Sequence, residues 1–132
     1  MTAADRPVDK PRPVYLNLFA IRQPLPTIAS VLHRASGALL FLAGIPLLLW
    51  YVQRSLASPE AFQAAMAPFA TPFGRIVLFV LAWAYVYHLF AGLRHLALDL
   101  HIGIRLGPVR SSAALVLVLS ILVALIIAVR LW

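Results

Sequence analysis

The sequence contains no cysteine, and only four of its 132 residues are acidic, against eleven lysines and arginines. The absence of cysteine excludes disulfides, iron–sulfur ligation and thiol nucleophiles contributed by this chain. Charged residues make up 11% of the chain and hydrophobic residues 63%, and the mean hydropathy is +0.93. Water-soluble domains of this length are far less apolar. The composition therefore predicts a membrane protein.

The basic residues flank apolar runs and form no basic cluster. This distribution is typical of the flanks of membrane spans and argues against nucleic-acid binding. A hydrocarbon core of about 30 Å takes roughly 20 residues per crossing, so the chain has room for three spans with short connections. Little length remains for a soluble catalytic domain.

The apolar runs predict an all-α membrane protein with three transmembrane helices. Residues 1–26, rich in proline and charge, are expected to form a cytoplasmic N-terminal segment. Residues 27–132 are expected to form a single transmembrane domain, with helices at about 27–53, 75–99 and 111–131. Pro46 should bend the first of these helices.

A short interfacial helix is expected between the first and second spans. Ser58, Pro59 and Glu60 form the signature of a helix start, with an N-cap, a proline at the first position and an acid in the first turn. This helix is expected to end before Pro68. Residues 100–110, which include Gly103, Gly107 and Pro108, are expected to form a basic turn before the third span.

The distribution of basic residues predicts the orientation of the chain. Eight lysines and arginines fall on one side of the membrane and three on the other. Because positive charge is enriched in cytoplasmic segments, the N-terminus should be cytoplasmic and the C-terminus periplasmic. The eight are Arg6, Lys10, Arg12, Arg22, Arg34, Arg94, Arg105 and Arg110, and the three are Arg54, Arg75 and Arg130.

The second span carries one polar stripe. His88, Gly92, His95 and Asp99 have offsets of four, seven and eleven, which place them in a band about 60° wide on a helix. His88 is about 16 Å from Asp99 along the axis, inside the hydrocarbon. A neutral imidazole can ligate haem iron, and Gly92 would leave room for a flat macrocycle. Alternatively, His88 hydrogen-bonds a neighbouring helix.

A haem bound through His88 alone would need a second ligand from a partner subunit or would be five-coordinate.

A second polar group, at the start of the first span, comprises Ser30, His33, Arg34 and Ser36. Ser30 and Arg34 are four residues apart, so both could donate to a carbonyl oxygen or a propionate. Alternatively, this is a capped helix start with an arginine that reaches toward the surface.

Two motifs together carry a family resemblance. They are His33-Arg34-Ala35-Ser36-Gly37, within RPVYLNLFAIRQPLPTIASVLHRASGALLF, and His88-(three residues)-Gly92-Leu93-Arg94-His95, within the second-span segment YHLFAGLRHLALD. Over nearly its whole length, the chain resembles the larger cytochrome b anchor of succinate dehydrogenase. This family passes electrons from succinate to ubiquinone in a bacterial inner membrane, with a flavoprotein, an iron–sulfur protein and a small membrane anchor as partners.

The resemblance implies a role for each matching residue. His88 would be one axial ligand of haem b, and the small anchor would supply the second. Ser30 and Arg34 would line the ubiquinone site, and His33, Arg94 and His95 would neighbour the haem propionates or the quinone. No residue of this chain would bind succinate.

Three alternatives remain open. One is the anchor of a fumarate reductase, which runs the same reaction in reverse. Another is a non-redox membrane transporter or assembly subunit in which His88 and Asp99 belong to a proton path. The third is a pure scaffold without a working quinone site.

Overall fold

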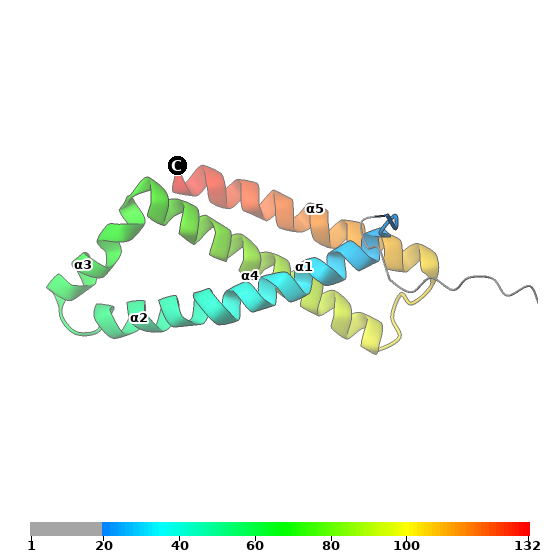
Figure 1. The fold of residues 1–132 in the computed structure, drawn as a ribbon, viewed down its shortest axis with the longest axis horizontal. Coiled ribbons are helices and arrows are strands. Elements are labelled where there is room, and N and C mark those ends of the chain that lie inside the picture. The colour runs from blue at the N-terminus through cyan, green and yellow to red at the C-terminus, as the bar shows by residue number, and fades with distance from the viewer. Residues whose placement is uncertain (1–19) are drawn as a thin grey trace, which may run out of the picture.

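The computed structural model describes residues 20–132, and within this range every regular element is a helix. The predicted all-α fold is therefore confirmed, whereas most of the predicted N-terminal segment lies outside the described residues. In chain order (Figure 1), the elements are α1 (Leu25–Leu39), the π-helix η2 (Leu40–Gly44), α2 (Ile45–Ser55), α3 (Pro59–Ala70), α4 (Pro72–Asp99) and α5 (Leu106–Leu131).

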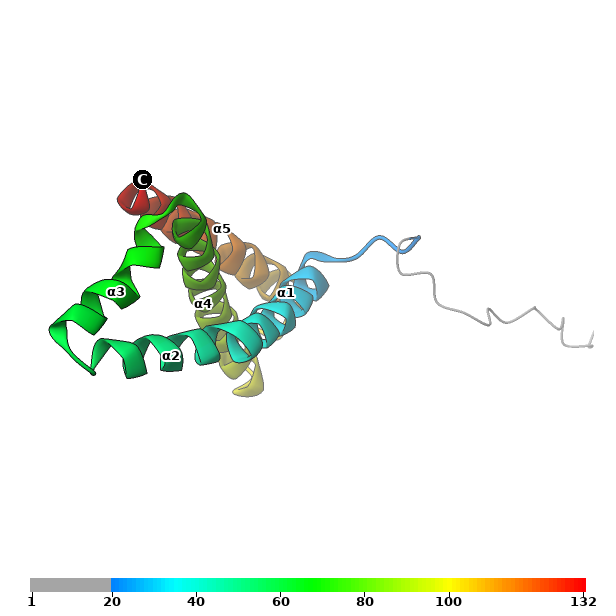
Figure 2. The same ribbon diagram turned by 60° about the vertical axis from the view of Figure 1, so that its left-hand side comes forward.

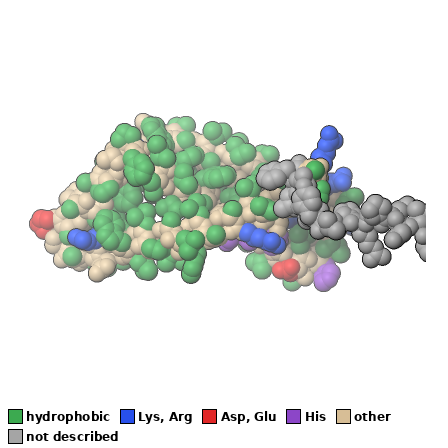
Figure 3. Space-filling view, in the orientation of Figure 1, with side chains coloured by type: hydrophobic (Ala, Val, Ile, Leu, Met, Phe, Trp, Pro, Cys, Tyr) green, Lys and Arg blue, Asp and Glu red, His purple; other side chains and the backbone are tan. Residues whose placement is uncertain are grey.

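Three helical segments are long and apolar enough to cross a membrane. They span Leu25–Ser55, Pro72–Asp99 and Leu106–Leu131, with 31, 28 and 26 residues. At about 1.5 Å per residue, each exceeds a hydrocarbon core of about 30 Å. On the face drawn in Figure 3, hydrophobic side chains cover the middle of the molecule and charged side chains gather toward its ends. The three predicted spans are confirmed.

The first span stays helical through its proline. It runs from Leu25 to Ser55, slightly beyond the predicted 27–53. Just before Pro46, where a bend is predicted, the helix makes one wide turn, in which the backbone N–H of Ile45 donates to the carbonyl of Leu40, five residues back. Because Pro46 has no N–H to donate, the normal hydrogen-bond ladder cannot continue there.

The interfacial helix α3 starts as predicted and ends later. The hydroxyl oxygen of Ser58 accepts a hydrogen bond from the Ala61 N–H at 3.1 Å. The prediction that the helix ends before Pro68 is wrong, because α3 continues to Ala70 with Pro68 in its last turn. The helix ends instead at Thr71, whose extended backbone (ψ 153°) is the conformation favoured before a proline.

Helices α4 and α5 both begin earlier than predicted. The side chain of Thr71 caps α4 by accepting from the Gly74 N–H at 3.0 Å, so the helix starts at Pro72 and not at 75. Helix α5 starts at Leu106 and not at 111, with Pro108 in its first turn. Proline is tolerated there because the first N–H groups of a helix have no partner within the helix. The predicted turn over 100–110 is therefore shorter.

Helix α4 is the centre of the bundle, with α1 packed against one side and α5 against another (Figures 1 and 2). Small residues line these contacts and are almost fully buried: Ala29, Ala84, Ala91, Ala113 and Ala124. Without large side chains between them, the helices can approach closely, as is usual in membranes. The Tyr87 hydroxyl donates to the Ala29 carbonyl at 2.8 Å and joins α4 to α1.

Helix α2 contacts α3, and η2 and α3 contact α4, at the other end of the molecule (Figure 2). The Tyr51 hydroxyl of α2 donates to the Met66 sulfur of α3 at 2.9 Å. An apolar cavity of 610 Å³ lies among α2, α3 and α4. It is remote from the polar residues of the first and second spans, so it is not part of the site described next.

Candidate functional site

Three histidines meet where α1 crosses α4. The ring of His33, from α1, is stacked on that of His88, with 4.2 Å between centroids and 16° between planes. His33 also lies 5.0 Å from the ring of His95. Gly92, between the two α4 histidines, has no side chain, and a Cβ there would be 3.6 Å from His33 Nε2. His88, Gly92 and His95 thus share the face of α4 that contacts His33.

The orientation of the His88 ring is fixed by α1. Its Nδ1 lies 3.0 Å from the backbone carbonyl oxygen of His33 and 3.2 Å from Ser36 Oγ. The Ser36 hydroxyl donates to the same carbonyl oxygen at 2.9 Å. A carbonyl oxygen only accepts hydrogen bonds, so His88 Nδ1 carries the proton and donates it. The lone pair of the neutral ring is therefore on Nε2, the nitrogen left free to bind a metal.

Gly37 makes room for this ring. A Cβ on Gly37 would lie 2.7 Å from His88 Cε1 and 3.2 Å from His88 Nδ1. Any larger residue would displace the imidazole. Ser36 and Gly37 belong to the motif that begins at His33. Their contact with His88 joins two helices, so the spacing of residues along either helix does not predict it.

The described residues contain no group of three histidine, cysteine or acidic side chains placed to hold a metal ion. The His33 ring is stacked on that of His88 and tilted relative to that of His95. A single histidine nitrogen can serve as an axial ligand to a haem, whose iron is otherwise held by the macrocycle.

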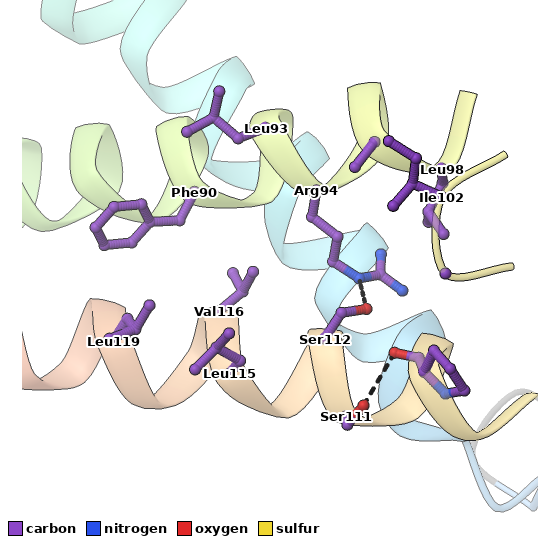
Figure 4. A pocket seen from close by; sticks show the side chains of 13 residues that line it. Phe90, Leu93, Arg94, Leu98, Ile102, Ser111, Ser112, Leu115, Val116 and Leu119 are labelled. Carbon is purple, nitrogen blue, oxygen red and sulfur yellow. Dashed lines mark hydrogen bonds between the residues drawn. The ribbon is translucent and has the colours of Figure 1, made fainter. Parts of the chain in front are cut away.

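Arg94 faces a different neighbour. It is six residues after His88, about 240° around the helix, and its side chain is directed to α5 (Figure 4). Arg94 Nε donates to Ser112 Oγ at 3.1 Å and Nη2 donates to the Val109 carbonyl at 3.2 Å. With 8% of its surface exposed, Arg94 joins α4 to α5 and does not enter the histidine cluster.

Ser30 and Arg34 lie near the histidines along α1 but are not joined to them. Ser30 is half-buried and Arg34 is exposed. Neither side chain lines the cavities of 690 and 610 Å³ found in the described chain. Arg34 is thus on a surface that another subunit could cover. Asp99 is exposed at the end of α4.

Comparison with known proteins connects this geometry with a family. Residues 8–127 match the model of the succinate dehydrogenase/fumarate reductase transmembrane subunit. The chain belongs to this family.

Similar proteins include succinate dehydrogenase cytochrome b556 subunits from two bacteria. That of Paracoccus denitrificans is 35% identical over 87% of this chain and 88% of its own length. That of Coxiella burnetii is 34% identical over 92% of this chain and 97% of its own length. Together with the three apolar helices, the family makes this chain a multi-pass membrane-anchor subunit of a bacterial inner membrane, one that works in a complex with other subunits.

Proposed function

We propose that this chain binds haem b and forms part of the quinone-reduction site of a succinate:ubiquinone oxidoreductase. The observation that carries the proposal is the fixed His88 ring, whose Nδ1 is bonded to the His33 carbonyl and whose Nε2 makes no hydrogen bond with the residues that the structure describes. An acceptor of this kind behind a ligating histidine sets the ring orientation and raises its basicity. The name of the relatives, cytochrome b556 subunits, supports a haem.

His88 would be the axial ligand from this chain, and the small anchor subunit would supply the second. His33 and His95 stand beside His88 and could donate hydrogen bonds to the propionates. When bound, haem b can accept and release one electron. The residues of this chain hold the ligating ring and keep its proton on Nδ1.

The quinone site would be shared with partner subunits. Ser30 and Arg34 would donate hydrogen bonds to a carbonyl oxygen of ubiquinone and stabilise the negative charge that develops on it during reduction. The exposure of Arg34 supports a site completed by another chain. Because this chain has no cysteine, the iron–sulfur clusters would be held by a separate subunit, and succinate would be oxidised on a flavoprotein subunit.

The first test is a reduced-minus-oxidised optical spectrum of membranes that contain this chain with its neighbouring subunits. The native complex should show a b-type band, and His88→Ala should abolish it or convert it to a high-spin form. The matched control is His101→Ala, at an exposed histidine in the turn after α4, which should keep the native spectrum. A native complex without a haem band would overturn the proposal and favour a transporter or assembly role.

The quinone assignment has its own test. Arg34→Leu should impair the reduction of ubiquinone by succinate and leave succinate oxidation by a soluble dye unchanged. Arg130→Leu, at the opposite end of the bundle, should affect neither activity. Normal ubiquinone reduction in a fully assembled Arg34→Leu complex would show that Arg34 is not in the site.

The family description also includes fumarate reductases. The relatives named here are succinate dehydrogenase subunits, which favours succinate oxidation. A complex that reduces fumarate with a low-potential quinol much faster than it oxidises succinate would reverse this assignment.

A further inference from the structure

A second site lies between α4 and α5, facing away from the histidines. It is a groove with a cavity of 690 Å³, drawn in Figure 4. On α4 it is lined by Leu93, Arg94 and Ala97. Ala97 is nine residues after His88, about 180° around the helix, so the groove and the histidine cluster occupy opposite faces of α4.

The polar side chains of the groove are gathered toward one of its ends, which Leu98 and Ile102 also line. Arg94, Ser111 and Ser112 lie at the end nearest the α4–α5 turn, whereas Phe90 and Leu119 lie at the other end (Figure 4). From Ser111 to Leu119, α5 rises about 12 Å. The groove therefore runs from the membrane surface into the hydrocarbon, and its polarity follows that of a phospholipid from headgroup to acyl chain.

The groove is open to its surroundings. Leu93 and Leu115, on its two walls, are 55% and 56% exposed, and Ile102 at its polar end is 63% exposed. Exposed leucines in a membrane normally contact acyl chains, so an acyl chain can fill the apolar part without any change in the helices.

The charge of the polar end selects the headgroup. Arg94 uses Nε and Nη2 for bonds to α5, while its Nη1 makes no hydrogen bond with the residues that the structure describes. Arg105 is the N-cap residue of α5 and is exposed. Asp99 is two residues after Ala97, about 200° around α4, so it faces away from the groove. The positive charges of Arg94 and Arg105 thus lie at this end, whereas Asp99 is on the other side of α4.

We propose that this groove is a binding site for an anionic phospholipid, with Arg94 Nη1 as a donor to the phosphate and an acyl chain along Leu115 and Leu119. Arginine is well suited to phosphate because its planar group offers several donors. A lipid phosphate carries the required charge at the depth of the headgroups.

The test is native mass spectrometry of the detergent-purified complex containing the full chain. Phosphatidylglycerol and phosphatidylcholine of the same acyl length are added, and their retention is compared. The native complex should retain phosphatidylglycerol preferentially. Arg94→Gln should lower this retention by about fivefold, the effect expected for one basic residue near an anionic lipid. Arg130→Gln, in the last turn of α5, is the charge-matched control.

A second pair of variants tests the groove without changing a buried charge, and it decides the matter if Arg94→Gln fails to assemble. Leu115→Trp would fill the groove and should release the lipid, whereas Leu125→Trp, on an equally exposed part of α5 outside the groove, should not. Equal retention of the two lipids by the native complex would overturn the proposal. So would normal retention in Leu115→Trp, or cross-linking of a partner helix into the groove.

Discussion

The Nδ1 of His88 lies 3.0 Å from the backbone carbonyl oxygen of His33. A backbone oxygen within a helix cannot rotate away, so α1 sets the orientation of a ring carried by α4. The Tyr87 hydroxyl, one residue before His88, bonds the Ala29 carbonyl one turn earlier in α1. Two successive side chains of α4 are thus fixed to the backbone of the same neighbour, which makes the site a product of the helix crossing.

Ser36→Ala should weaken haem binding without breaking the fold. The variant removes the hydroxyl that lies 3.2 Å from His88 Nδ1 but keeps the His33 carbonyl. Complete loss of the hydrogen-bond partner behind a ligating histidine lowers metal affinity by at least about tenfold. Because the His33 carbonyl remains in Ser36→Ala, the loss of haem affinity should stay near about tenfold. A less basic ring should also raise the midpoint potential. Haem content and a redox titration measure both effects.

Ser120→Ala is the matched control for Ser36→Ala. Ser120 is also buried, and its hydroxyl donates to a carbonyl of its own helix, that of Leu117, at 2.9 Å. It does not contact a histidine in the described structure. If the two variants had equal haem content and potential, Ser36 would have no role in orienting His88.

Gly37→Ala should displace the His88 ring. The added Cβ would be 2.7 Å from His88 Cε1, too close for any real contact, so the ring must move and its bond to the His33 carbonyl must lengthen. We expect loss of haem or a change to high spin, measured by the optical spectrum at equal protein level. Gly44→Ala on the same span is the control, because its Cβ would meet only the side chains of Leu40 and Leu81, at 3.4 Å and 3.8 Å.

Gly92→Ala tests whether the haem macrocycle packs against Gly92, in a variant whose helices should still pack normally. In this structure its Cβ would lie 3.6 Å from His33 Nε2, an ordinary contact, so the protein should assemble normally. If the macrocycle packs against Gly92, the variant should nevertheless bind haem poorly. Full haem content in Gly92→Ala would place the macrocycle elsewhere.

Hydrophobic periodicity was sufficient to predict the three spans and the shared face of His88 and His95, since both depend on one helix at a time. The start of α4 was predicted too late, although Thr71 and Pro72 form the same signature that identified α3 at Ser58 and Pro59. The contacts of Ser36 and Gly37 with His88 could not be predicted, because they depend on how two helices cross. Arg94 illustrates the same limit, since its partners belong to α5.

The start of α3 should be less stable in acid. The backbone N–H of Glu60 and the side chain of Ser58 bond its carboxylate, and these bonds lower the pKa of Glu60 below its ordinary value of 4.5. A lowered pKa in the folded state stabilises the helix above that ordinary value, and the effect is lost as the pH falls through the lowered pKa. Hydrogen exchange of the α3 amides should therefore accelerate in that range.

Glu60→Gln should remove this pH dependence, because the amide does not titrate. Ser58→Ala should move the acceleration to higher pH, since one of the bonds that lower the pKa is lost. If the α3 amides of the native chain and of Glu60→Gln showed the same pH profile, Glu60 would not be the group responsible.

Gly74→Ala should disrupt the corner between α3 and α4. A Cβ on Gly74 would overlap the backbone carbonyl of Pro68, and this carbonyl is held by the Thr71 hydroxyl at 2.7 Å. Because no flexible side chain can yield, the clash must move the backbone, at a cost of about 1–3 kcal/mol. Gly107→Ala, with no atom within 4 Å of its Cβ, should be neutral or stabilising by up to about 1 kcal/mol. Thermal unfolding of the two purified variants in detergent measures the difference, and equal midpoints would show that the corner opens without cost.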